Sequence, residues 1–254
     1  MFQKLFSTAE HLENRYWEID FLRGAAIIAM VISNFITDLG YFNILDINSL
    51  SGFWWLFSRA TAVIFIFLVG VSLTLSYSRT QSAKRAAQSQ ILLKYLKRGL
   101  KIFGWGLIIT FVSWLFLKQD LILFGVLHLI GISIILAYPL LKFRFANLFL
   151  GAFLVAMWSY SQNFWINSMW LLWLAPLNNY FSVDYLPLIP WFSAVLIGIF
   201  IGNTLYTGGI RNFKIPKFEN LLLIKFLTFL GRNSLLIYLI HQPILILALK
   251  ILSG

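Results

Sequence analysis

Long runs of apolar residues are the feature of this chain that most restricts its fold. The runs at 60–75, 104–117 and 194–201 each lie in a stretch of roughly 18 or more residues with few charges. They are apolar on every side, whereas the strands of an outer-membrane barrel alternate apolar and polar residues. The chain is 60% hydrophobic and 11% charged, and about a quarter of an ordinary soluble domain is charged. The sequence therefore predicts membrane-spanning helices.

The predicted fold is all-α: a polytopic transmembrane helical bundle of about seven spans that forms a single domain over residues 1–254. Two shorter apolar stretches, 165–177 and 221–230, are too short to cross about 30 Å of hydrocarbon and are predicted to be interfacial or re-entrant helices. An eighth crossing is left open. The predicted spans cover residues 21–41, 54–77, 100–117, 121–141, 146–160, 186–206 and 234–252.

The connections between these spans differ in charge. Those at 78–99, 142–144 and 207–225 are basic, whereas those at 42–52, 118–120 and 161–185 contain Lys118 as their one basic residue. Because cytoplasmic loops collect Lys and Arg, we expect a multi-pass protein of the cell membrane with a cytoplasmic N-terminus. The net charge of +11 is attributed to this bias and to anionic lipids. Nucleic acid is not an expected partner, because the aromatic residues lie in the spans.

Polar side chains follow one face of the first predicted span. Asp20 and Asp38 share one direction on a helix, and Arg23 and Asn34 lie within about 60° of it. An ion pair of Asp20 with Arg23, and interhelical hydrogen bonds from the other two, would explain these residues structurally. A stripe across the whole span instead indicates a functional pathway. Arg59, in the second span, is expected either to snorkel outward or to pair with Asp38 or the acid of the preceding loop.

Two histidines are expected deep in the membrane. His128 lies between two glycines in the fourth span, and His241 lies in the last span, two residues before a proline. Each alone is consistent with a hydrogen-bonded packing residue, but together with Asn34 and Asp38 they suggest a shared polar pocket. No metal or haem is predicted, because the histidines and Asp38 lack the close spacing typical of ligands.

Several sequence blocks follow one another in a recognisable order. They are EIDFLRG at 18–24, followed by Met30, Val31 and Asn34, then FLVGVSL at 67–73, FGVLHLIG at 124–131, Pro190-Trp191 and GRNSLLIYLIHQP at 231–243. Together they resemble the heparan-alpha-glucosaminide N-acetyltransferase-like family of membrane proteins, especially its short prokaryotic members. The resemblance covers nearly the whole chain.

The resemblance implies a membrane acyltransferase that takes an acetyl group from cytoplasmic acetyl-coenzyme A. The acceptor at the opposite face would be an amino sugar or a similar small molecule. Asn34 matches an asparagine that the family uses at its active site. The animal enzyme has a catalytic histidine in the following outer loop, whereas residues 42–52 of this chain contain Asp46 and no histidine.

Acyl transfer needs a base, donors for the thioester oxyanion, and cations for the phosphates of the donor. His128 or His241 is the expected base and Asn34 an oxyanion donor. Membrane lipids are further expected partners, and a homodimer is left open. The alternative is a non-catalytic transporter or lipid-binding membrane protein, in which the stripe lines a permeation path; a purely structural subunit is a third reading. The predicted catalytic residues are Asn34, Asp38, His128 and His241, and the predicted contacts to acetyl-coenzyme A are Arg23, Arg98, Lys101 and Arg232.

Overall fold

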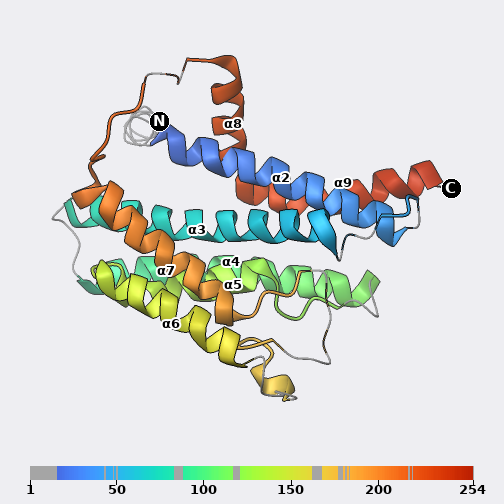
Figure 1. Cartoon of the computed structure of the whole chain (residues 1–254), viewed down its shortest axis with the longest axis horizontal. Coiled ribbons are helices and arrows are strands. Elements are labelled where there is room, and N and C mark those ends of the chain that lie inside the picture. The colour runs from blue at the N-terminus through green and yellow to red at the C-terminus, as the bar shows by residue number, and fades with distance from the viewer. Residues whose placement is uncertain are drawn as a thin grey trace. The chain divides into compact units, whose positions relative to one another are not determined.

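The computed structural model of the chain divides into two compact units, Met1–Phe65 with Ile215–Gly254, and Ile66–Lys214. The described residues form helices joined by turns and irregular segments, with no strand among them (Figure 1). The long helix α3 (Gly52–Ser82) contributes to both units. Described are residues 16–42, 44–47, 49, 51–82, 88–116, 121–161, 168–176, 180, 182, 184–216, 218 and 220–253.

The first unit is built around α2 (Trp17–Tyr41), which packs against α8 (Leu222–Arg232) and α9 (Ser234–Ser253). The contact with α8 is a close backbone approach at two glycines. A Cβ atom on Gly24 would overlap the backbone of Leu227, and one on Gly231 would overlap the backbone of Asp20. The absence of side chains at these two positions therefore lets α2 and α8 touch directly.

The second unit contains the rest of α3 and four further helices. α4 packs against α5, and α6 packs against α7, which also contacts α5. Its buried aliphatic residues include Leu129, Ile134 and Ile199, all 0% exposed. The helices are α4 (Gln88–Phe116), α5 (Val126–Ala137), α6 (Phe145–Ser161) and α7 (Leu188–Leu205), with 3-10 turns η1 (Tyr138–Leu140), η2 (Met169–Leu171) and η3 (Thr207–Gly209).

Within the described part of the chain, 5 helices are long and apolar enough to cross a membrane: α2, α3, α4, α7 and α9. The all-α, multi-pass character predicted from the sequence is thereby confirmed. The predicted spans at 121–141 and 146–160 correspond to shorter apolar helices, so their crossing, and the total of seven, remain predictions, as does the single domain. The short helix predicted at 221–230 is α8. A second short helix was predicted at 165–177. The structure describes residues 168–176 of this stretch, and these residues contain only the turn η2.

The predicted span at 121–141 was wrong at its start, because residues 121–125 are not helical. Side chains from elsewhere in the second unit satisfy the backbone of this segment instead. The hydroxyl of Thr110 donates to the Ile122 carbonyl at 2.6 Å, and the Ile122 N–H donates to Ser113 at 3.2 Å. The hydroxyl of Tyr180 donates to the Leu121 carbonyl. Irregular backbone is tolerated in a membrane protein where such partners replace the helical hydrogen bonds.

The basic connections of the second unit meet at one end of it. The rings of Tyr77 and Tyr138 lie 6.5 and 5.4 Å from Tyr95, which joins the end of α3 and the turn η1 to the start of α4. Arg144, before α6, donates to Thr204 at the end of α7 at 3.0 Å. This common end is consistent with the predicted cytoplasmic face, and the orientation itself remains a prediction.

Candidate functional site

Two successive residues of α9 bind two polar residues of α2 inside the first unit. Asn34 and Asp38 are one helical turn apart and therefore share a face of α2. The Nδ2 atom of Asn34 lies 2.7 Å from Nε2 of His241. The next residue, Gln242, donates from Nε2 to both carboxylate oxygens of Asp38, at 2.8 and 3.1 Å. We call these four residues the α2–α9 cluster.

The hydrogen bonds of His241 fix which ring nitrogen carries the proton. Its Nδ1 lies 2.7 Å from the carbonyl oxygen of Tyr238, and a carbonyl oxygen can only accept. Nδ1 is therefore the donor, and Nε2 of the neutral ring has a lone pair that accepts from the amide of Asn34. The side chain is only 8% exposed. His241 is thus a buried, oriented imidazole with its basic nitrogen directed toward α2.

Asp38 is a buried acid with a single donating side chain next to it. The residue is 7% exposed, and Gln242 is the one side chain among the described residues that donates to it. The Oε1 atom of Gln242 is itself buried and has no partner in this part of the structure. The cluster therefore presents unused acceptor positions next to a carboxylate.

An apolar groove of about 230 Å³ lies on the first unit between α2, α8 and α9. Along α2 it occupies the stretch that precedes Asn34, so the polar face predicted for this helix is interrupted in its middle. Only aliphatic side chains line the groove: Ile27, Ile28, Val31, Ile32, Leu230 and Ile237.

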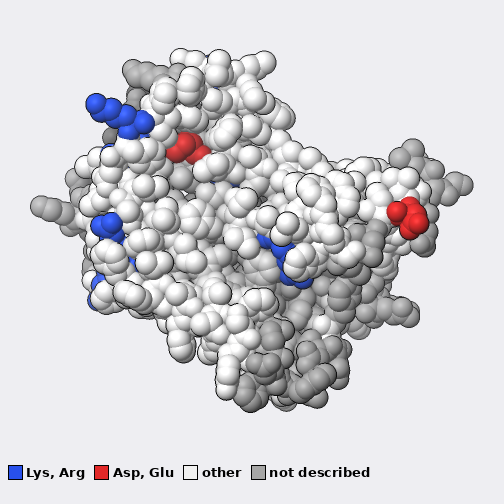
Figure 2. Space-filling model, in the orientation of Figure 1, with Lys and Arg blue, Asp and Glu red and all other residues white. Residues whose placement is uncertain are grey.

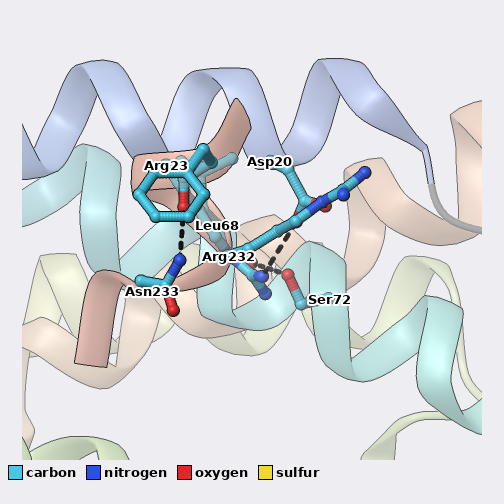
Figure 3. A network of polar contacts seen from close by, with 7 residues as sticks. Asp20, Arg23, Leu68, Ser72, Arg232 and Asn233 are labelled. Atoms are coloured by element: carbon cyan, nitrogen blue, oxygen red, sulfur yellow. Dashed lines mark hydrogen bonds and ion pairs between the residues drawn. The ribbon is translucent and has the colours of Figure 1, made fainter. Parts of the chain in front are cut away.

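A second polar cluster lies at the other end of α2. The carboxylate of Asp20 receives Arg23 at 3.5 Å and Arg232 at 3.3 Å (Figure 3). The Asp20 side chain is 6% exposed, whereas that of Arg232, at the end of α8, is 37% exposed. One acid thus holds two guanidinium groups. Asp20 and Asp38 are separated by 18 positions, or about 27 Å of helix, which is close to the thickness of the hydrocarbon core.

The family model for the heparan-alpha-glucosaminide N-acetyltransferase catalytic domain matches residues 15–243. The chain belongs to this family. No curated protein and no solved structure matched the chain. The structure shows what two blocks of the acetyltransferase family do here. The first, at 18–24, supplies Asp20 and Arg23, and the last, at 231–243, supplies Arg232 and His241 on the opposing helices.

Two of the four predicted cofactor contacts lie together, because Arg23 and Arg232 share Asp20. The other two, Arg98 and Lys101, lie on α4 in the second unit and are exposed. Charge is sparse on the face shown in Figure 2, where Lys and Arg atoms form separate patches on a largely uncharged surface. A joint phosphate site for all four residues therefore remains a prediction.

His128 has a different environment from His241. It lies in the second unit and is 2% exposed. Its Nδ1 accepts from the N–H of Gly125 at 3.2 Å, and its Nε2 lies 3.4 Å from the hydroxyl of Thr110. The ring also stacks on Phe124, with centroids 5.5 Å apart. His128 therefore holds the start of α5 in place, and the predicted pocket shared with His241 remains a prediction.

No role was predicted for Gln242, which the structure places against Asp38. The only signal was its position, since it is a polar residue between His241 and a proline in an otherwise apolar helix. Arg59 does not pair with Asp38 among the described residues; its guanidinium lies 5.9 Å from the ring centroid of Trp55. Helical periodicity identifies the polar face of one helix but not the residue that another helix brings to it.

Proposed function

We propose that this protein transfers an acetyl group from acetyl-coenzyme A to an amine acceptor, and that the α2–α9 cluster is where the transfer occurs. The family is one of membrane acetyltransferases, which supports the reaction class. The observation that carries the location is the hydrogen bond between Asn34 and His241. It joins the asparagine that resembles the family's active-site residue to an oriented base.

His241 acts as the general base in this proposal. The Tyr238 carbonyl keeps the proton on Nδ1, so Nε2 is free to accept a proton from the attacking nitrogen once the Asn34 amide moves aside. The displaced N–H of Asn34 then donates to the thioester carbonyl oxygen, where negative charge develops in the transition state. One short movement of a side chain thereby supplies both the base and the oxyanion donor.

The phosphates of the donor bind at the opposite end of α2. Arg23 and Arg232 bring two guanidinium groups together at Asp20, and a guanidinium can bind a phosphate with two parallel hydrogen bonds. The groove along α2 then leads from this end toward Asn34. Arg98 and Lys101, the other two predicted contacts to acetyl-coenzyme A, have no part in this proposed site. With the N-terminus in the cytoplasm, acetyl-coenzyme A enters from that side.

The aliphatic lining of the groove favours a second candidate function, a non-catalytic protein that binds or moves lipid. Such a protein would bind acyl chains in the groove without cleaving a thioester. In proteoliposomes it would show lipid flux without acyl transfer, and Asp38→Asn would abolish that flux.

The test uses purified protein with acetyl-coenzyme A and glucosamine, and follows the free thiol and the acetylated sugar. His241→Gln should lower turnover by about 100-fold or more, the usual contribution of a general base. His11→Gln, at the third histidine of the chain, which has no part in the proposed site, is the control and should leave turnover unchanged. Equal turnover in His241→Gln and wild type would contradict the proposed base.

A further inference from the structure

We propose that Asp38 and Gln242 bind the ammonium group of the acyl acceptor, and that Asp38 removes its first proton. This inference rests on the proposed function and assigns the acceptor's reacting nitrogen to a specific pair of side chains. The pair lies in the first unit, where Gln242 donates to both oxygens of Asp38.

The pair has acceptor capacity that its present hydrogen bonds do not use. A carboxylate offers about four lone-pair positions, and the described residues give Asp38 one donor group, the amide of Gln242. The Oε1 atom of Gln242 is buried without a partner. A ligand that completes this site must bring several donors and no acceptors. An ammonium group has that composition, with three N–H donors and a positive charge.

Among the described residues, no cationic side chain pairs with Asp38; its side-chain partner is the neutral amide of Gln242. Arg23 and Arg232 pair with Asp20 instead, and Arg59 lies over Trp55. A carboxylate is unfavourable inside a membrane, and acids retained there typically face a partner or a ligand. A cationic acceptor would remove this cost when it binds.

The site is also in the right place for the reaction. Asp38 is one turn of α2 beyond Asn34, with about 5–6 Å between Cβ atoms at this spacing. Gln242 directly follows His241 in α9. An amine held by Asp38 and Gln242 therefore lies beside the base and beside the donor for the thioester oxygen. It also lies toward the end of α2 that is remote from Asp20.

The proton balance explains why two acceptors are needed. The ammonium group gives one proton to Asp38 and becomes a neutral amine with a lone pair. The nitrogen then forms a bond to the thioester carbon, and the carbon–sulfur bond breaks. The second proton passes from the nitrogen to His241 Nε2 and from there to the thiolate that leaves. The products are an amide, a thiol and one proton on Asp38. Asp38 releases this proton to water before the next turnover.

The test separates amine binding from acetyl transfer. Binding of glucosamine, and of glucose as its neutral analogue, is measured by calorimetry on wild type, Asp38→Asn and Asp46→Asn. Asn at position 38 still accepts a hydrogen bond from Gln242, so the fold should be kept, and Asp46 is an exposed acid that serves as the matched control. Asp38→Asn should weaken glucosamine binding roughly tenfold, the loss expected for a hydrogen bond to a charged group.

Asp46→Asn should change glucosamine binding by less than about twofold, as expected for an exposed charge, and glucose should bind all three proteins equally weakly. If Asp38→Asn does not fold, Gln242→Met decides, because it removes the unpaired oxygen and should also weaken glucosamine binding. Wild-type affinity for glucosamine in Asp38→Asn, or no glucosamine binding by wild type, overturns the amine site. Selective glucosamine binding without any acetyl transfer would instead contradict the proposed function and leave the amine site standing.

Discussion

At the scale of single residues, the hydrogen bonds of the two buried histidines place the ring proton on opposite nitrogens. Nδ1 of His241 donates to a carbonyl, whereas Nδ1 of His128 accepts from the N–H of Gly125. His128 is therefore tied to the start of α5 through Nδ1, and its Nε2 lies next to Thr110 of α4. The sequence correctly indicated that both histidines are buried, but burial alone does not distinguish a base from a cap. The two roles differ because the backbone partners differ, a carbonyl for His241 and an N–H for His128. The pattern of side chains along the sequence does not predict these backbone contacts.

His128→Ala should therefore act on stability. The change leaves the N–H of Gly125 without its partner and opens a space against Phe124, which together should cost about 1–3 kcal/mol. The melting temperature in detergent and the yield should fall, while turnover per folded molecule changes little. His241→Gln should show the reverse pattern. A loss of turnover with an unchanged melting temperature in His128→Ala would contradict the capping role.

Arg23→Lys tests the donor end of α2. Lysine lacks the planar fork that binds a phosphate through two hydrogen bonds, so affinity for coenzyme A should fall. The Arg23 side chain is 22% exposed and lies 3.5 Å from Asp20, and lysine keeps the positive charge next to this buried carboxylate. The melting temperature without ligand should therefore hardly change. Arg144→Lys is the control. Equal affinities for coenzyme A in Arg23→Lys and wild type would contradict the proposed contact between Arg23 and a phosphate.

At the scale of helices, the join between α2 and α8 depends on two glycines. The sequence predicted the polar face of α2 and the short helix α8, but not that Gly24 and Gly231 bring their backbones into contact. A glycine in a helix can serve a turn, a ligand or close helix packing. The role of Gly24 and Gly231 in close packing becomes visible only when the facing helix is in place. The non-helical start at 121–125 escaped prediction for a similar reason, since its partners Thr110 and Tyr180 are distant in sequence.

Gly24→Ala should separate α2 from α8, because the added Cβ atom would overlap backbone that cannot rotate away. Overpacking of this kind costs about 1–3 kcal/mol. The melting temperature should fall, and coenzyme A binding should weaken as Arg232 moves away from Asp20. Gly104→Ala is the matched control, since nothing lies within 4 Å of a Cβ atom at that position. Similar melting temperatures for both variants would show that the join tolerates a side chain.

At the scale of the whole molecule, topology is the next claim to test. The chain has no cysteine, so single cysteines report sidedness without background. Two variants are compared, Lys142→Cys and Asp46→Cys. Position 142 is at the basic end of the second unit, and position 46 is in the loop after α2. A membrane-impermeant maleimide should label position 46 in intact cells and position 142 only after permeabilisation, because basic connections stay in the cytoplasm. The opposite labelling would reverse the predicted orientation.

The most direct test of the account is the direction of acetyl transfer across a membrane. Proteoliposomes of known orientation receive labelled acetyl-coenzyme A on the side of position 142 and glucosamine on the side of position 46. The account predicts labelled N-acetylglucosamine in the glucosamine compartment, and its loss in His241→Gln. No product, or product formed only when both substrates share one compartment, would contradict transfer along α2 from one face of the membrane to the other.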